Sequence, residues 1–148
     1  MIFVTTGTSY KFDELVKEID KIAPLLKEEV IIQIGKSDYK PKNCKYFRFA
    51  PSLISYIKKA NLVICHGGAG TTTEVLCIKK KLISVENKNV NDSHQWDILK
   101  KFDSMKYLIW CRDITQIFDC IKNGLKEKRC VYKKPPCNIH KYIKRALI

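Results

Sequence analysis

The sequence predicts an α/β protein whose core is a doubly wound, mainly parallel sheet of six strands. Three observations lead to this expectation. Short apolar runs bounded by turn residues alternate along the chain with stretches whose apolar residues recur at helical spacing. Strands that alternate with helices favour parallel pairs joined by crossover connections. The 148 residues fit one domain, and no apolar run approaches the roughly 20 residues of a membrane span.

The first half of the chain predicts three strands and two helices. Apolar residues recur at helical spacing from Phe12 to Ile22, so one face of the first helix is buried. A hydroxyl in the turn at residues 7–10 is available to cap this helix, and Pro24 ends or kinks it. Pro51 suits the first turn of the second helix. We expect strands at residues 2–6, 30–34 and 46–49, with a polar loop over residues 36–43.

Three more strands are expected at residues 62–65, 82–85 and 107–110. After caps at residues 91–93, a helix carries Gln95, Ile98, Leu99 and Phe102 on one stripe, which places Gln95 on the inward face near the carboxyl edge of the sheet. Asp113 and Gln116 form a capping pair for the next helix, and Gly124 is a helix stop. Asn138 can cap a last helix that ends the chain.

The stretch that follows the fourth strand carries the strongest functional signal. His66 precedes three glycines and one alanine, and a helix begins immediately afterwards. The free N–H groups and positive dipole end of such a helix attract phosphate, so diphosphate binding is the first hypothesis. The dinucleotide-binding and Walker fingerprints do not match here. Thr71 and Glu74 also have the spacing of a capping box, which is compatible with ligand binding, and His66 is as readily structural as ligand-binding.

The net charge of +13 is unevenly distributed along the chain. The last 29 residues contain nine basic residues and one acid, Glu127, and so carry +8. This asymmetry is compatible with an anionic neighbour, which would be a nucleic acid, an acidic lipid surface or an acidic protein, but composition alone favours a solvated basic tail. No recognisable DNA- or RNA-reading motif is present, which argues against nucleic acid.

Seven cysteines form an odd set without a C-x-x-C pair. The N-terminus has no basic leader, so we expect no signal peptide and a cytoplasmic protein. In that compartment, buried free thiols are favoured over disulfides or zinc. Cys137 and His140 supply only two ligands, so we expect no metal site.

Three segments resemble the donor-binding half of GT-B glycosyltransferases, whose fold is Rossmann-like. The resemblance runs in order from Ile2 to about Phe118. It is nearest to half-size members, namely the small catalytic subunit of the two-subunit enzyme that adds the second N-acetylglucosamine to the dolichol-linked glycan, and similar exopolysaccharide transferase subunits. The segments are Phe3-Val4-Thr5-Thr6-Gly7-Thr8 with Phe12-Asp13-Glu14-Leu15, Cys65-His66-Gly67-Gly68-Ala69-Gly70-Thr71 with Glu74, and Asn91-Asp92-Ser93-His94-Gln95.

The resemblance implies transfer of a sugar from a UDP-sugar to a lipid-linked acceptor, and we expect no metal or other cofactor. The sugar would be N-acetylglucosamine or another hexose or hexuronic acid. The resemblance also implies the role of each matching residue. It implies diphosphate binding by His66, Gly67, Gly68, Gly70 and Thr71, ribose binding by Glu74, a place near the phosphates across the cleft for Gly7 and Thr8, and a place beside the donor sugar for His94 and Gln95, which are the catalytic candidates.

The resemblance further implies a separate, membrane-anchored subunit that supplies the acceptor half. The chain would be cytoplasmic and would associate with the membrane through that partner, and the basic helical tail at about residues 133–148 is a candidate for docking on it or on anionic lipid. Self-association of the chain stays open. Two departures from the family pattern, at Lys79-Lys80-Lys81 and Glu86-Asn87, put the sugar selectivity in doubt. The alternative function is a non-catalytic module that binds a nucleotide or nucleotide-sugar.

Overall fold

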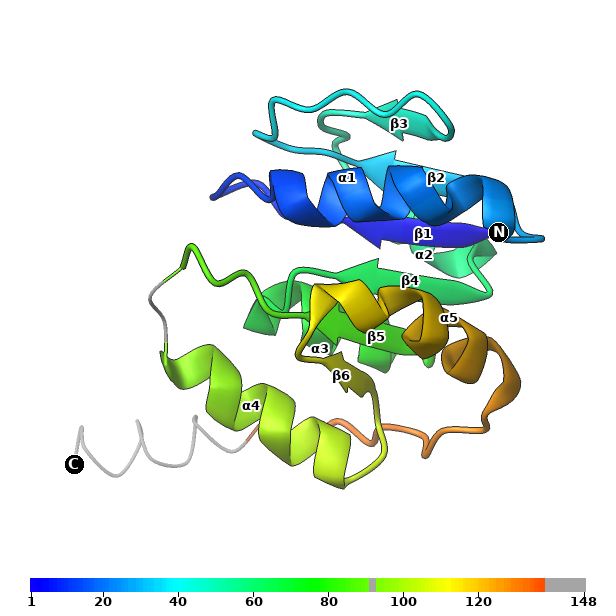
Figure 1. Ribbon diagram of the computed structural model, residues 1–148. Coiled ribbons are helices and arrows are strands. Elements are labelled where there is room, and N and C mark those ends of the chain that lie inside the picture. Colours follow the sequence, from blue (N-terminus) through cyan, green and yellow to red (C-terminus); the bar gives the residue numbers. More distant parts are fainter. Residues whose placement is uncertain (91–92, 138–148) are drawn as a thin grey trace.

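The computed structural model describes residues 1–90 and 93–137 (Figure 1). Within these residues, six strands form one sheet in the order β3-β2-β1-β4-β5-β6, and every neighbouring pair is parallel. The strands are β1 (Ile2–Thr5), β2 (Val30–Gln33), β3 (Lys45–Phe47), β4 (Leu62–Cys65), β5 (Leu82–Val85) and β6 (Ile109–Cys111). The helices are α1 (Asp13–Ile22), α2 (Ile54–Lys59), α3 (Ala69–Cys77), α4 (Ser93–Ser104) and α5 (Ile117–Lys126), with 3-10 turns η1 (Ala23–Leu25) and η2 (Ile114–Gln116).

The chain builds the sheet outward from β1 in two directions. It first passes from β1 to β2 and β3, and then returns to the other side of β1 for β4, β5 and β6. The direction therefore switches between β1 and β4, where Thr5 pairs with Cys65. Ligands of parallel α/β sheets bind outside the carboxyl ends of the strands at such a switch. The predicted doubly wound parallel sheet is confirmed, and its topology points to the loops after β1 and β4.

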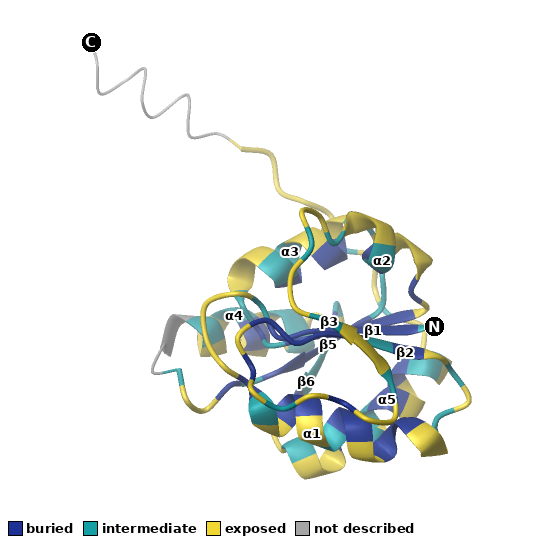
Figure 2. Cartoon of the chain, turned by 90° about the horizontal axis from the view of Figure 1, so that it is seen from above, coloured by how far each residue is buried: buried dark blue, intermediate teal, exposed yellow. Residues whose placement is uncertain are grey.

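Helices cover both faces of the sheet, and Figure 2 shows the buried residues concentrated in the strands and on the helix faces turned toward them. One core joins α1 and α5 to the sheet through residues such as Leu15, Ile19 and Ile121. The other core joins α2, α3 and α4 through residues such as Val75 and Leu99. Because both faces are covered, the central strands β1, β4 and β5 are buried along their whole length, as parallel strands usually are.

Two strands lie at other positions than the apolar runs predicted. β6 begins at Ile109, because the register with β5 pairs Ile83 with Ile109 and Val85 with Cys111. The preceding Leu108 is buried in the core beneath α4 instead of forming part of the sheet. β3 likewise ends at Phe47, since its partner β2 ends at Gln33. Burial against a helix therefore accounts for Leu108, whereas Phe49, which the pattern assigned to the third strand, lies beyond β3 and is exposed.

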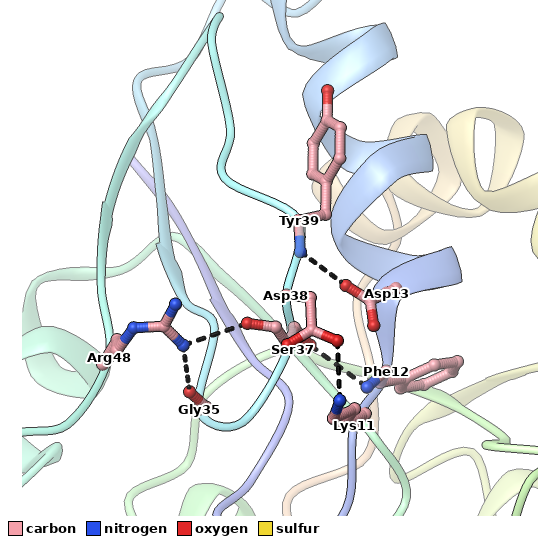
Figure 3. Close-up of polar contacts among 8 residues, drawn as sticks. All are labelled: Lys11, Phe12, Asp13, Gly35, Ser37, Asp38, Tyr39 and Arg48. Atoms are coloured by element: carbon pink, nitrogen blue, oxygen red, sulfur yellow. Dashed lines mark hydrogen bonds and ion pairs between the residues drawn. The ribbon is translucent and has the colours of Figure 1, made fainter.

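The hydroxyl cap predicted for the first helix is wrong. α1 has Phe12 at its N-cap, and this side chain makes no capping hydrogen bond. Instead, the hydroxyl of Ser37, in the loop after β2, accepts the Phe12 N–H at 3.1 Å. Figure 3 shows this contact beside the bond from the Tyr39 N–H to Asp13 at 2.7 Å. The start of α1 is thus stabilised by a loop distant in sequence.

The capping pair predicted for the last described helix is half right. Asp113 accepts the Thr115 N–H at 2.9 Å, but it caps the 3-10 turn η2. Gln116 is itself the N-cap of α5 and makes no side-chain capping bond. Pro24 lies in η1, directly after α1, so its predicted role at the end of that helix is confirmed. The caps expected at Asn91 and Asp92 and the helix expected from Asn138 lie outside the described residues.

Gly124 does not end its helix, which corrects the prediction. α5 continues through this position to Lys126, and Gly124 is buried. A Cβ built on it would meet Leu62 Cδ1 at 3.2 Å and Ile83 Cδ1 at 3.4 Å. Glycine is therefore placed here by the close approach of α5 to the sheet.

Asp20 anchors the loop between β2 and β3 to α1. This carboxylate is 1% exposed. It accepts hydrogen bonds from the Tyr39 hydroxyl at 2.8 Å, the Lys42 N–H at 3.0 Å and the Asn43 N–H at 2.7 Å. Burial by itself raises the pKa of Asp20, but these hydrogen bonds outweigh it, and the pKa lies below its usual value. An ionised, fully bonded carboxylate therefore holds the loop.

The cysteines are all free within the described residues. Cys65 and Cys111 are buried, and Cys44 and Cys120 are half-buried. The prediction of buried thiols fails for three others, because Cys77, Cys130 and Cys137 are exposed. No helix in the described part of the chain has the length and apolar character needed to span a membrane.

Candidate functional site

A cavity of about 220 Å³ opens at the carboxyl ends of the strands where the chain switches direction. The loop after β1 forms one wall, and the loop after β4 with the first turn of α3 forms another. Six of the residues singled out in the sequence lie together here. They are Gly7, Thr8, His66, Gly68, Gly70 and Thr71.

The imidazole of His66 packs between the two glycine loops. Gly7 has φ +75°, a left-handed conformation that favours glycine, and a Cβ there would meet the ring at 2.5 Å from Cε1. A Cβ on Gly68 would overlap Nε2 of the same ring. The ring therefore fixes the spacing between the loops that follow β1 and β4. Only residues without a side chain permit this contact.

The buried position of His66 favours its neutral form. Burial lowers the pKa of His66, and the Thr5 backbone opposes this shift only in part. The Nδ1 atom is buried and has no hydrogen-bond partner among residues 1–90 and 93–137. A neutral imidazole can donate or accept one hydrogen bond here without bringing a charge into the cavity.

α3 presents its N-terminus to the cavity without a side-chain cap. Its N-cap is Gly68, which makes no side-chain hydrogen bond. The capping box predicted for Thr71 and Glu74 is therefore wrong, because Thr71 already lies inside the helix. The first backbone bond of the helix runs from the Thr72 N–H to the Gly68 carbonyl at 2.9 Å. In the described chain, the N–H groups of residues 69–71 thus have no backbone acceptor, as expected at a helix start.

Four predicted site residues do not line this cavity. Gly67 is buried behind it with φ +80°, and a Cβ there would meet Leu99 Cδ1 at 3.0 Å. Glu74 is exposed, one turn further along α3. Gln95 is half-buried in the first turn of α4. His94 also belongs to α4, and its side chain lies outside the described residues.

Three hydrogen-bonded contacts hold the walls of the cavity in place. Arg48 donates to the carbonyls of Gly35 at 3.1 Å and Ser37 at 3.0 Å, as Figure 3 shows. Gly35 packs so closely on Gly7 that a Cβ would overlap the Gly7 carbonyl oxygen. On the other side, the buried Asn87 amide donates to the Lys11 carbonyl at 2.9 Å. This bond joins the loop after β5 to the loop after β1, which forms one wall of the cavity.

Residues 1–147 of the chain match the glycosyltransferase family 28 C-terminal domain. The chain belongs to this family. Its fold agrees with that assignment, because a six-stranded parallel sheet with helices on both faces is the Rossmann-like C-terminal half of GT-B glycosyltransferases. The cavity therefore lies at the carboxyl edge of a family 28 domain.

Among similar proteins is the UDP-N-acetylglucosamine transferase subunit ALG13 of Homo sapiens, which is 32% identical over 123 residues. That match covers 74% of this chain but only 11% of the human protein. A solution NMR structure of ALG13 is similar with a TM-score of 0.61 at 21% identity, covering 99% of this chain and 94% of that one. The glycosyltransferase SsfS6 of Streptomyces sp. SF2575, solved with thymidine diphosphate, gives a TM-score of 0.67 at 18% identity over 86% of this chain and 33% of the other. These structural likenesses show a shared fold.

Four residues that line the cavity of this family 28 domain were not singled out in the sequence. Gln33 left a signal, because it is the polar residue in the apolar run Val30-Ile31-Ile32-Gln33-Ile34. The others gave no signal of their own, since a threonine at a strand end, a serine in a loop and a leucine at a helix start are all common. They are Thr5, Ser9 and Leu53.

Proposed function

We propose that this family 28 domain binds the UDP-sugar donor of a glycosyltransferase, with N-acetylglucosamine as the first candidate sugar. One observation carries the proposal. The uncapped N-terminus of α3 opens onto a cavity at the switch point of the sheet, and Gly70 and Thr71 lie on that cavity's wall. Backbone N–H groups at the positive end of a helix dipole suit the diphosphate of a nucleotide-sugar. The name of the human relative, a UDP-N-acetylglucosamine transferase subunit, supports the choice of donor.

The remaining site residues take their roles from this placement. The Gly7 loop would approach the phosphates from the side opposite α3, with Thr8 offering a hydroxyl. Glu74 would accept hydrogen bonds from the ribose hydroxyls, because an exposed carboxylate one turn beyond the cavity is free to accept them. His94 and Gln95 would lie beside the donor sugar, at the start of α4.

The acceptor half of the site would come from a separate, membrane-anchored subunit that holds a lipid-linked acceptor. Among the described residues that line the cavity, His66 is the only one with a titratable side chain, and none carries a carboxylate. A general base that activates an acceptor hydroxyl would then be supplied from outside this cavity. The chain itself would stay cytoplasmic, would reach the membrane through that partner and would need no metal.

Titration of the full chain tests the donor assignment. Calorimetry with UDP, UDP-N-acetylglucosamine, ADP and NAD should show a preference for the uridine ligands. A preference for ADP or NAD would contradict the assignment. Efficient sugar transfer by the chain alone would instead remove the need for a partner subunit.

Gln95→Ala tests the placement of the donor sugar. The variant should lower the transfer rate measured with the partner more than it lowers UDP affinity. Its matched control is Gln116→Ala, which alters an exposed glutamine at the start of α5, away from the cavity, and should change neither quantity. If Gln95→Ala lowers the melting temperature without changing discrimination between UDP and the UDP-sugar, Gln95 is a structural amide.

Removal of residues 137–148 tests the docking role of the basic tail. Truncation should weaken association with the partner's membranes while UDP binding stays largely intact. The charge-dependent part should fade as salt rises, because exposed charges are screened within roughly 8 Å at physiological ionic strength. Unchanged co-sedimentation would mean that the tail is only solvated.

A second candidate is a non-catalytic module that binds a nucleotide or nucleotide-sugar. The absence of a carboxylate from the cavity wall within the described residues favours it. The two candidates make different predictions once a partner subunit is present. Transfer that depends on the partner and is abolished by donor-site variants supports the enzyme subunit.

A further inference from the structure

Gln33 is a polar residue in a place where an apolar one is expected. It ends β2, which has β1 on one side and β3 on the other, and it is 2% exposed. The rest of β2 is Val30, Ile31 and Ile32. A buried amide lowers stability unless its polar atoms find hydrogen-bond partners. The contacts of this side chain therefore indicate why it is an amide.

Two hydrogen bonds fix the orientation of that amide. The Gly7 N–H donates to Thr5 Oγ1 at 3.3 Å, so the hydroxyl acts as an acceptor there. The hydroxyl's own hydrogen is donated to Gln33 Oε1, and Thr5 Oγ1 donates to no other acceptor in the described chain. The carbonyl end of the Gln33 amide faces Thr5 in this bond, and its NH₂ end faces away from it.

The NH₂ group of Gln33 is the part of the side chain that remains available. It has no hydrogen-bond partner within residues 1–90 and 93–137, yet it is not among the buried unpartnered atoms there, which are His66 Nδ1, Trp110 Nε1 and Arg129 Nε. Its nitrogen is thus not fully enclosed, although Gln33 is only 2% exposed overall, and Gln33 lines the cavity together with Gly70 and Thr71 of α3. An amide NH₂ group can only donate hydrogen bonds, and the helix N–H groups beside it are also donors. A ligand that meets both must present acceptors, as phosphate oxygens do.

We propose that Gln33 binds the diphosphate of the donor nucleotide through its side-chain NH₂ group, and that Thr5 is a positioning residue that keeps this group turned toward the cavity. The inference rests on the proposed donor site and adds two residues to it. Because the same hydroxyl holds the Gly7 N–H, the conformation of the Gly7 loop and the orientation of Gln33 are coupled through Thr5.

Four variants of the full chain separate the two roles. Gln33→Met keeps a similar shape but has no donor, and Gln33→Glu keeps the acceptor for Thr5 while replacing the NH₂ with oxygen. Each should lower the affinity for UDP and for inorganic diphosphate at least tenfold. Thr5→Val keeps the shape of threonine without the hydroxyl and should lower both affinities several-fold, whereas Thr5→Ser should restore them. Calorimetry gives the affinities, and melting without ligand reports folding.

NMR of the unmodified, isotope-labelled chain gives a readout that does not depend on any variant folding. The assigned side-chain NH₂ signals of Gln33 should shift when UDP or inorganic diphosphate is added. The proposal is overturned if these signals do not move, or if folded Gln33→Met and Thr5→Val bind both ligands as tightly as the unmodified chain. In that case a preference of the unmodified chain for UDP over ADP would still support the proposed function. Binding of diphosphate without any preference for UDP would instead contradict the proposed function and leave the Gln33 contact measurable.

Discussion

Gly70→Ala should make the protein more stable and its donor site weaker at the same time. Gly70 is the second residue of α3, and a Cβ built on it meets nothing within 4 Å. Alanine is therefore accommodated without strain and reduces the conformational freedom of the unfolded chain. The expected gain is about 0.5–1 kcal/mol. For a protein of this size, that corresponds to a rise of about 1–4 °C in melting temperature.

The same methyl group would lie on the wall of the cavity, where the N–H groups of α3 are open. If a phosphate approaches these groups, the added atom holds it away from them. Loss of a hydrogen bond to a charged group costs about 1.5–3 kcal/mol. We therefore expect UDP affinity to fall by about 10- to 100-fold. Calorimetric titration with UDP measures this fall, and a thermal melt without ligand measures the gain in stability.

Gly124→Ala is the matched control for this experiment. It makes the same chemical change inside a helix, but Gly124 faces the side chains of Leu62 and Ile83 and not the cavity. Its UDP affinity should equal that of the unmodified chain. The reasoning is refuted if Gly70→Ala binds UDP as tightly as the unmodified chain, or if both substitutions weaken binding equally.

Three further substitutions test other parts of the structure. Glu74→Gln should leave the melting temperature nearly unchanged, because Glu74 is exposed and belongs to no capping box. Its UDP affinity should fall about tenfold, because a charge-assisted hydrogen bond to the ribose becomes a neutral one. Equal UDP affinities of the variant and the unmodified chain in calorimetry would exclude the ribose role. Asp20→Asn should cost about 1–3 kcal/mol of unfolding free energy at pH 7, where the carboxylate is ionised and accepts the Lys42 and Asn43 N–H groups. Since the folded-state pKa of Asp20 is lowered, its contribution to the free energy of unfolding is present above the ordinary pKa of about 3.9 and is lost as the pH falls through the folded-state pKa. Urea unfolding should therefore show the stability difference between the unmodified chain and Asp20→Asn narrowing in acid. A stability difference that does not change with pH would contradict this. Lys79→Gly should raise the melting temperature by about 2–4 °C, because Lys79 has φ +59° and relief of a left-handed conformation is worth about 1 kcal/mol. Lys80→Gly is the control and should lower the melting temperature, since Lys80 Nζ donates a hydrogen bond to the Ala60 carbonyl at 3.0 Å.

The sequence alone was sufficient for the architecture and for most of the residues that line the candidate site. Parallel strands covered on both faces are recognisable as short apolar runs, and the residues at 62–65 and 82–85 formed the strands expected of them. The glycine-rich turn after His66 is likewise a local signal, because its backbone conformation depends on a few consecutive residues. Six of the ten predicted site residues line one cavity, four of them between His66 and Thr71, while the pairing of β1 with β4 brings Gly7 and Thr8 beside them.

The helix starts and the glycine of α5 needed the tertiary structure. Whether Thr71 or Gly68 is an N-cap depends on where the chain leaves the sheet edge, and the Thr-x-x-Glu spacing occurs in either case. Gly124 looked like a helix stop, yet α5 continues through it to Lys126, and the glycine instead lets the helix approach Leu62 and Ile83 of the sheet closely. Neither outcome is encoded in neighbouring residues.

The pairing of Thr5 with Gln33 shows the same limit at the site itself. The two residues are 28 positions apart and become partners only because β1 and β2 pair in a register that places them side by side. The sequence supplied the two polar side chains and the apolar strands that bury them. Register and packing decided which atoms meet. A hydrogen bond is sensitive to differences of a few tenths of an ångström in donor–acceptor distance, and residue types alone do not set that distance.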